Sequence, residues 1–504
     1  MTPTEIVRLF RTYSPPQATV ADPEFAAIMG LNPNVVYEDD MSKRDSLNLN
    51  IYMPAFPLTS DEKRPVCVWI YGGGFKMGSI TTPLYDCTQL VSTSVEQNKP
   101  MIMVSINYRV NFFGFMSSKE LVLDSQTYAN TVPEHLRRWY DGSIGNWGLL
   151  DQFSVLGGFA FKGDPKRVTV MGESAGSTSI AYLMLIPQCH GLFHRSIMQS
   201  GAAFTLPAIR PEHRGQRCFD YLCRAFDIPD DLSGADKVAK LRNVPEKSLA
   251  EELNKSELLT SDPTFTPTLD GVLFKDYSPL VAQDSSLMFT ASFTVTNPKN
   301  IAKLKSKLCA PDDGPVFDQL FGVFKNDEDS TEIGERLISN CIFLYPVFQA
   351  SEAILAHPSC QLTRYHVDVR VAKIDEKAPG CKSFHGVDLP YVFGNKTASS
   401  FLSHKEMLFS KEMQGVWTDV ITSKSLGVST LPKVINLQST PLSGKEPIRQ
   451  EAVLFGADLK IGRGVVEMMS AEEVAFWKRP YAYAVEQAHQ GRGTKIGVNL
   501  FKSL

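Results

Sequence analysis

The chain has 504 residues, of which 43% are hydrophobic and 21% charged, and its formal net charge is −4 at pH 7. These proportions are typical of a globular protein with a large core. Lys and Arg form no basic stripe, which argues against binding of nucleic acid. No apolar run reaches the roughly 18 residues of a membrane helix, and the nine cysteines show neither zinc spacing nor a disulfide framework. We expect no membrane span, no nucleic-acid partner and no metal.

Strand-like runs alternate with helix-like segments along the first half of the chain. The strand-like runs lie at 47–53, 65–75, 101–110, 167–172 and 195–203. The segment 148–161 is typical of a helix between two of them, and the stretch from about 205 to 370 is more helical and more charged. This alternation favours a mostly parallel central sheet with helices on both faces. We predict an α/β fold in which residues 1–504 form a single domain with helical insertions.

One stretch, RVTVMGESAGSTSIAYLML at 167–185, carries a chemical signal. Ser174 stands between Gly172 and Gly176, where a strand pattern gives way to a helix pattern. Glycines are needed on such a turn because side chains there would collide with the neighbouring strand and helix. The turn exposes the serine hydroxyl, which needs a base and oxyanion donors to act as a nucleophile. We therefore predict that Ser174 is a catalytic nucleophile.

The oxyanion donors are predicted from backbone N–H groups. The N–H of Ala175 stands at the start of the helix, where it has no helical partner and the helix dipole favours negative charge. A second set is expected from YGGGF at 71–75, because its three glycines follow a buried strand and allow close approach of a substrate.

Several motifs in order now resemble a known family. The motifs are GESAGS, WIYGGGF, INYRVNFFGF, GNWGLLDQ and FHGVDLPYVFG, spread between Asp45 and Phe393. They resemble the type-B carboxylesterase/lipase family of the α/β-hydrolase fold, and its fungal-type members in particular. The resemblance implies a Ser-His-Glu triad, an acyl-enzyme intermediate, a small-molecule ester substrate and no cofactor. It assigns the oxyanion hole to the N–H groups of Gly73, Gly74 and Ala175, and makes Glu173 a buried acidic neighbour of the site.

The base is expected after the serine, because the triad order in this fold is serine, acid, histidine. Of the nine histidines, His385 lies in KSFHGVDLPYVFG, which resembles the family's catalytic histidine loop. We therefore assign the role of general base to His385.

The acid is missing from its expected place. The family carries it in an Asp-Glu-Gly triplet, but no such triplet lies between Gly271 and His385, and the chain looks shortened near 272–290. Asp284, in DSSLMF, is the nearest candidate, and a solvated loop aspartate is an equally good interpretation. Loss of the acid can cost about 10⁴ in rate without abolishing catalysis. Three explanations stay open: a substitute carboxylate, a slow or inactive relative, or a wrongly joined reading frame.

The N-terminal region also departs from the family. The opening hairpin and a GIPYA-like segment are missing before the matched region, and Ser46 stands where secreted members have a cysteine. No signal peptide is visible, so we expect a cytoplasmic protein with reduced thiols, or a secreted one if the N-terminus is truncated. The glycosylation sequons at Asn254 and Asn395 are accordingly expected to be unused.

The sequence thus predicts a serine carboxylic ester hydrolase acting on an uncharged or apolar ester. Two other functions remain open at this point. One is a non-catalytic scaffold that binds a partner, as in neuroligins, which the absent glutamate favours and the retained Ser174 and His385 oppose. The other is an acyltransferase or biosynthetic tailoring enzyme that uses the same residues with an acceptor other than water. The oligomeric state does not follow from the sequence.

Overall fold

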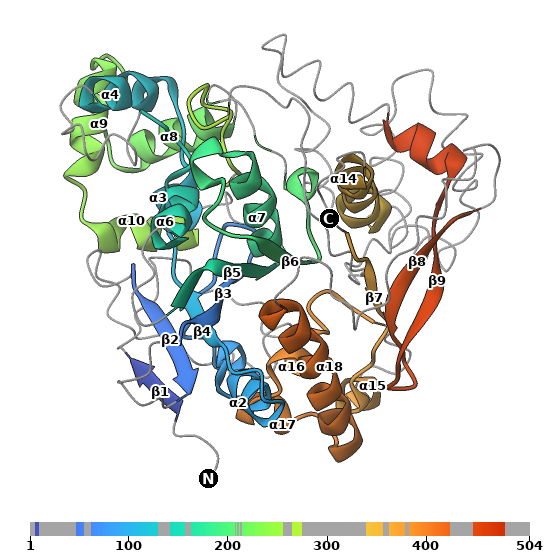
Figure 1. Ribbon diagram of the computed structural model, residues 1–504. Coiled ribbons are helices and arrows are strands. Elements are labelled where there is room, and N and C mark those ends of the chain that lie inside the picture. Colours follow the sequence, from blue (N-terminus) through green and yellow to red (C-terminus); the bar gives the residue numbers. More distant parts are fainter. Residues whose placement is uncertain are drawn as a thin grey trace.

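The computed structural model describes about three fifths of the chain. The described residues are 6–9, 47–54, 62–129, 142–156, 163–206, 208, 211, 214–255, 265–274, 339–355, 362–377, 383–423 and 447–478. Figure 1 shows them as a layered α/β structure around a twisted sheet.

The main sheet within these residues has six strands in the order β1-β2-β4-β3-β5-β6. The strands are β1 (Ile6–Leu9), β2 (Leu49–Pro54), β3 (Arg64–Ile70), β4 (Ile102–Ile106), β5 (Gly163–Glu173) and β6 (Arg195–Gln199). The four strands β4, β3, β5 and β6 are parallel, whereas β1 and β2 pair antiparallel at one edge. The five predicted strands are confirmed as β2 to β6. Strand β1 was not predicted, because four residues are too few to show an alternation.

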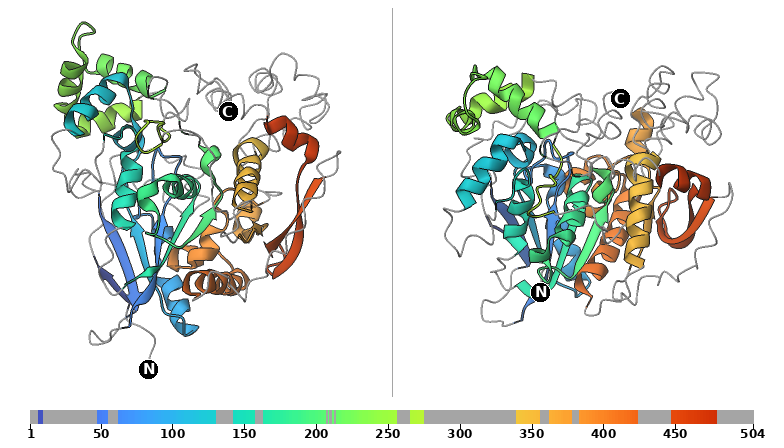
Figure 2. Two further views of the ribbon diagram at one scale, coloured as in Figure 1. Left: turned by 45° about the horizontal axis from the view of Figure 1, so that its top comes forward. Right: turned by 90° about the horizontal axis from the view of Figure 1, so that it is seen from above.

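Helices cover both faces of this sheet (Figures 1 and 2). One face carries α3 (Asn111–Phe115), α6 (Trp147–Leu156) and α7 (Ala175–Leu185), and the other carries α2 (Thr88–Glu96), α16 (Leu389–Phe393) and α18 (His404–Thr422). Helix α7 contacts β3, β5 and β6, and α18 contacts β3 and β5. The central strand β3 is therefore shielded from water on both sides, which explains its continuous apolar run VCVWI.

The remaining elements extend the body at two ends. A helical group at one end consists of α4 (Lys119–Ala129), α8 (Arg214–Ala225), α9 (Gly234–Arg242) and α10 (Glu246–Lys255). At the other end lie α14 (Tyr345–Leu355), α15 (Ala372–Lys377) and a three-stranded sheet of β7 (Tyr365–Val367), β8 (Pro447–Phe455) and β9 (Ile461–Ser470). Short helices are η1 (Pro83–Tyr85), η2 (Pro187–Cys189), η3 (Ala203–Thr205), the π-helical η4 (Ser339–Leu344) and α17 (Lys396–Ser399).

Core contacts join the late helices to the early strands. The ring of Trp69 on β3 lies 5.0 Å from that of Phe393 on α16, edge to face. The buried hydroxyl of Thr93 on α2 donates to Oε1 of Gln414 on α18 at 2.6 Å. These contacts fix α16 against the sheet, and the histidine loop that precedes α16 is thereby held near the strand ends.

The structure bears on two expectations from the sequence, one on the glycosylation sequons and one on membrane spans. The Asn395 side chain is buried, and its Nδ2 donates to the carbonyls of Pro83, Leu84 and Asp86, so this sequon is inaccessible in the folded protein. The side chain of Asn254 lies outside the described residues. In the described part of the chain, every helix is too short or too polar to cross a bilayer.

Candidate active site

Ser174 occupies the sharp turn between β5 and α7. Its φ and ψ are +54° and −118°, a conformation that few non-glycine residues adopt, and its N–H donates to Gln199 O at 2.8 Å. A Cβ on Gly176 would lie 2.0 Å from the carbonyl oxygen of Ile70, and one on Gly172 would lie 2.7 Å from the Gly176 carbonyl carbon. Both glycines are therefore required by backbone packing, as the sequence predicts, and Ser174 itself stays partly exposed.

The glycine loop after β3 packs directly against this turn. A Cβ on Gly72 would lie 2.6 Å from Oε2 of Glu173 and 2.8 Å from Cβ of Ser174. Gly73 and Gly74 follow with φ of +117° and +63°. Among the described residues, none accepts a backbone hydrogen bond from the N–H of Gly73, Gly74 or Ala175.

His385 lies in the turn that precedes α16. Its Nε2 is 3.1 Å from Oε1 of Glu173, the residue before the serine. The ring of Phe343, from η4, packs on the imidazole with a centroid distance of 5.0 Å and an interplanar angle of 39°. Burial lowers the pKa of His385, so its imidazole is neutral at neutral pH, as a general base must be. The structure thus brings Ser174, Glu173 and His385 together from segments more than 200 residues apart.

Two buried carboxyl groups lie beneath the site. Glu173 and Asp388 are 5% and 0% exposed. Burial, and after it the charge of Asp388, raises the pKa of Glu173 well above its usual range. Burial also raises the pKa of Asp388 to about 6, although Nε2 of Gln199 donates to it. Burial therefore favours the neutral form of the Glu173 carboxyl group, which faces the imidazole of His385.

The predicted triad acid is not placed by these contacts. Asp284 lies outside the described residues. Asp270, just upstream, is fully used in a structural role: its Oδ1 accepts the N–H groups of Val272, Leu273 and Phe274, and its Oδ2 accepts from Ser143 and Asn146. Glu173 is the carboxyl group that the described contacts place against the His385 imidazole.

Three residues at the site were not found from the sequence. Gln199 ends a correctly predicted strand, but nothing in that strand marked its amide as the partner of Asp388. Phe343 comes from a helix 42 residues before His385, with no motif of its own. Asn111 stands within INYRVNFFGF, where the pattern indicated family resemblance but not a contact to the glycine loop.

The site has features of a serine hydrolase of the α/β-hydrolase fold: a strained serine between strand and helix, a glycine loop packed against it, and a histidine that contacts the residue before the serine. In the described residues there is no group of three or more His, Cys, Asp and Glu side chains arranged to hold a metal ion.

Comparison with known proteins agrees with this class. The sequence model of the carboxylesterase family matches residues 13–131 and 135–303. A para-nitrobenzyl esterase of Bacillus subtilis (strain 168) is 27% identical over 402 residues, which are 74% of this chain and 73% of that esterase. Carboxylesterase 5A of Ovis aries is 36% identical over 235 residues, 46% of this chain and 52% of the sheep protein. Pyrethroid hydrolase Ces2e of Rattus norvegicus is 27% identical over 412 residues, 74% of this chain and 65% of the rat protein.

The chain therefore belongs to the carboxylesterase family, whose class of activity is carboxylic ester hydrolysis. The predicted α/β-hydrolase fold and ester-hydrolase class are confirmed. The aligned segments span from about half to about three quarters of these three relatives' own lengths.

Proposed function

We propose that the protein hydrolyses carboxylic esters through an acyl-enzyme on Ser174. His385 takes the hydroxyl proton while Ser174 Oγ bonds to the ester carbonyl carbon. The N–H groups of Gly73, Gly74 and Ala175 hold the resulting oxyanion. As the intermediate collapses, His385 gives the proton to the leaving alcohol, and the acyl group stays on the serine. Water, deprotonated by His385, then releases the carboxylic acid and restores the enzyme.

The observation that carries this proposal is the elbow itself. Ser174 has a strained φ of +54°, and the glycine loop packs against it, with no backbone acceptor for the N–H of Gly73 or Gly74 among the described residues. Strain of this kind persists only where the surrounding packing enforces it, and it is concentrated at functional sites. A scaffold that only binds a partner has no physical need of a strained serine near a partly buried histidine.

The buried Glu173, whose pKa is raised by burial, has a role in this scheme. A neutral carboxyl group beside Nε2 adds no negative charge where the oxyanion forms, whereas an ionised one would oppose it. We assign Glu173 a positioning role toward His385. Asp284 stays our candidate for the triad acid.

We further propose an uncharged, apolar acyl or alcohol group in the substrate. Phe343 lies against His385, which gives the site an apolar wall beside the imidazole. Two relatives are named for hydrolysis of para-nitrobenzyl esters and of pyrethroids, and both kinds of ester are apolar.

The test is turnover of p-nitrophenyl butyrate by the wild type and by Ser174→Ala, His385→Ala and Asp284→Asn. We expect kcat to fall at least about 10³-fold in Ser174→Ala and His385→Ala, because each variant removes a member of the triad. Asp284→Asn need not lose as much as Ser174→Ala. A fall in its kcat of more than about 10-fold would identify Asp284 as the acid. Product analysis with added short alcohols separates hydrolysis from acyl transfer, and wild-type activity equal to that of Ser174→Ala would refute the proposal.

We also propose that the protein works in a reducing compartment of the cell, as a cytoplasmic enzyme. Five cysteines whose side chains the structure describes carry free, buried thiols: Cys67, Cys87, Cys189, Cys218 and Cys223. Cell fractionation of the tagged full-length protein tests this, and recovery from the culture medium would contradict it.

A further inference from the structure

The glycine loop after β3 has a backbone conformation that is unfavourable on its own. Gly73, Gly74 and Phe75 all have positive φ, and Phe75 at +59° carries a side chain that disfavours this region. Within the loop, the N–H groups of Lys76 and Met77 share one acceptor, the Gly73 carbonyl, at 3.0 and 3.2 Å. Such a strained turn persists only when contacts from outside enforce it.

Asn111, the first residue of α3, supplies contacts of this kind. Its backbone N–H donates to the Phe75 carbonyl at 2.6 Å, and its side-chain Nδ2 donates to the Lys76 carbonyl at 3.4 Å. Its Oδ1 accepts the N–H of Phe113 at 3.2 Å, so the amide bridges the loop to α3. Asn111 is fully buried and has a φ of +49°, a conformation that asparagine tolerates better than other side chains.

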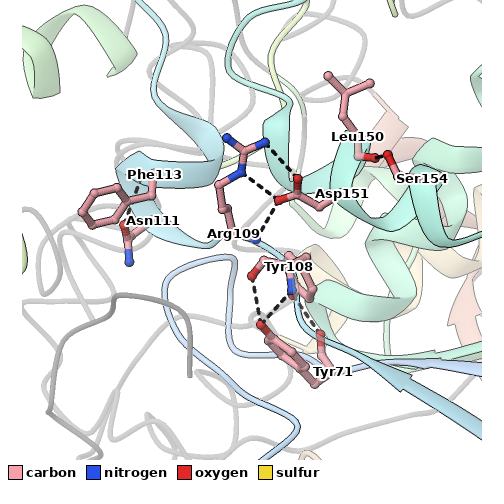
Figure 3. Close-up of polar contacts among 8 residues, drawn as sticks. All are labelled: Tyr71, Tyr108, Arg109, Asn111, Phe113, Leu150, Asp151 and Ser154. Carbon is pink, nitrogen blue, oxygen red and sulfur yellow. Dashed lines mark hydrogen bonds and ion pairs between the residues drawn. The ribbon is translucent and has the colours of Figure 1, made fainter. Parts of the chain in front are cut away.

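The segment that carries Asn111 is held in place by several polar contacts, which are drawn in Figure 3. Tyr71 and Tyr108 stack at 4.5 Å and exchange hydrogen bonds, each hydroxyl donating to the other residue's carbonyl. Arg109 donates from Nε and a terminal nitrogen to Asp151 on α6, both at 2.8 Å, and its backbone N–H donates to the same carboxylate at 3.0 Å. The glycine loop is thus held at its start by Tyr108 and at its end by Asn111.

We propose that Asn111 is a positioning residue of the oxyanion hole, which fixes the N–H groups of Gly73 and Gly74 through its two contacts to the carbonyls of Phe75 and Lys76. The inference rests on the proposed function, because it concerns the same oxyanion. A donor displaced by a fraction of an ångström loses much of its stabilisation of the transition state while the folded protein stays intact.

Two substitutions distinguish the contribution of the Asn111 side chain from that of its backbone N–H. Asn111→Asp keeps the size and the Oδ1 acceptor, but it sets an oxygen against the Lys76 carbonyl where an N–H stood. Asn111→Gly removes the side chain, retains the backbone N–H and adopts positive φ freely. Asn50→Asp is the matched control, because Asn50 is equally buried, on β2, and its Nδ2 donates to the Tyr52 hydroxyl, away from the glycine loop.

The measurements are kcat and KM for p-nitrophenyl butyrate and the inhibition constant of a trifluoromethyl ketone. This ketone forms a hemiketal when Ser174 Oγ bonds to its carbonyl carbon, with the serine proton taken by His385 and the oxyanion left in the hole. We expect Asn111→Asp to lower kcat about 10-fold or more with KM within about two-fold, and Asn111→Gly to lower it less. The inhibition constant should rise by the same factor as kcat/KM falls.

The outcomes are separable from those of the proposed function. If the wild type itself lacks Ser174-dependent turnover, the proposed function fails and this inference fails with it. If the wild type is active and the inhibition constant is unchanged in both variants, Asn111 has no role in the hole and only this inference is overturned. Parallel losses in Asn50→Asp would show a general effect of buried charge and would also overturn it. Should Asn111→Asp fail to fold, Asn111→Gly decides.

Discussion

Asp388→Asn should change how the stability of the protein depends on pH. Asp388 is fully buried, and burial raises the pKa of its carboxyl from 3.8 to about 6 in the folded state. Such a group binds its proton more tightly when folded, so the stability it confers is present below the unfolded pKa and is lost as pH rises toward the folded pKa. The full window is worth about 3 kcal/mol, because each pKa unit is worth about 1.4 kcal/mol. About 2 kcal/mol of this falls between pH 4.5 and pH 7.5.

Asparagine carries no such titration, and its Oδ1 can still accept from Gln199. We therefore expect the free energy of unfolding of Asp388→Asn, relative to wild type, to increase by about 2 kcal/mol from pH 4.5 to pH 7.5 in urea denaturation followed by tryptophan fluorescence. Asp419→Asn is the control, because Asp419 pairs with Lys99 near the surface. We expect no comparable increase in the free energy of unfolding of this variant, relative to wild type, as pH rises. A difference that stays constant or decreases with pH in Asp388→Asn would refute the reasoning.

Three further predictions concern the glycines and the base. Gly73→Ala places a Cβ 2.2 Å from the Met77 carbonyl oxygen, whereas a Cβ on Gly74 meets nothing within 4 Å. We therefore expect kcat to fall about 10² in Gly73→Ala and clearly less in Gly74→Ala. Equal losses in the two variants would contradict this. Gly176→Ala directs a Cβ at the Ile70 carbonyl, and its thermal unfolding should show a destabilisation of at least about 2 kcal/mol. Because burial lowers the pKa of His385, kcat/KM should fall only below about pH 6.5 as the solution is acidified, and a midpoint above 7 would be inconsistent with that environment.

Local sequence was sufficient for the elbow and its surroundings. The strand, the small residues and the helix around Ser174 are adjacent in sequence, and the required glycines follow from backbone packing over a few residues. The same is true of the five strands β2 to β6, whose apolar runs reflect burial on both faces.

Contacts between distant segments could not be predicted in this way. The family motif indicated His385, but that its Nε2 contacts Glu173 depends on how α16 packs on β3 and α18 on α2. The raised pKa of Asp388 needs its complete burial beside Gln199, and no sequence pattern reports that degree of desolvation. Asn111 is similar: its side chain contacts a loop 35 residues earlier, and only the fold brings the two together.

We propose Ser174 as an activated nucleophile in a formed oxyanion hole. The most direct test is labelling of the purified full-length protein with a fluorophosphonate, followed by intact mass, with Ser174→Ala alongside. The probe requires an activated serine and oxyanion donors but no particular ester. We expect rapid addition of one label per chain to the wild type and none to the variant. Absence of labelling in well-folded wild-type protein, or equal labelling of both proteins, would contradict the claim.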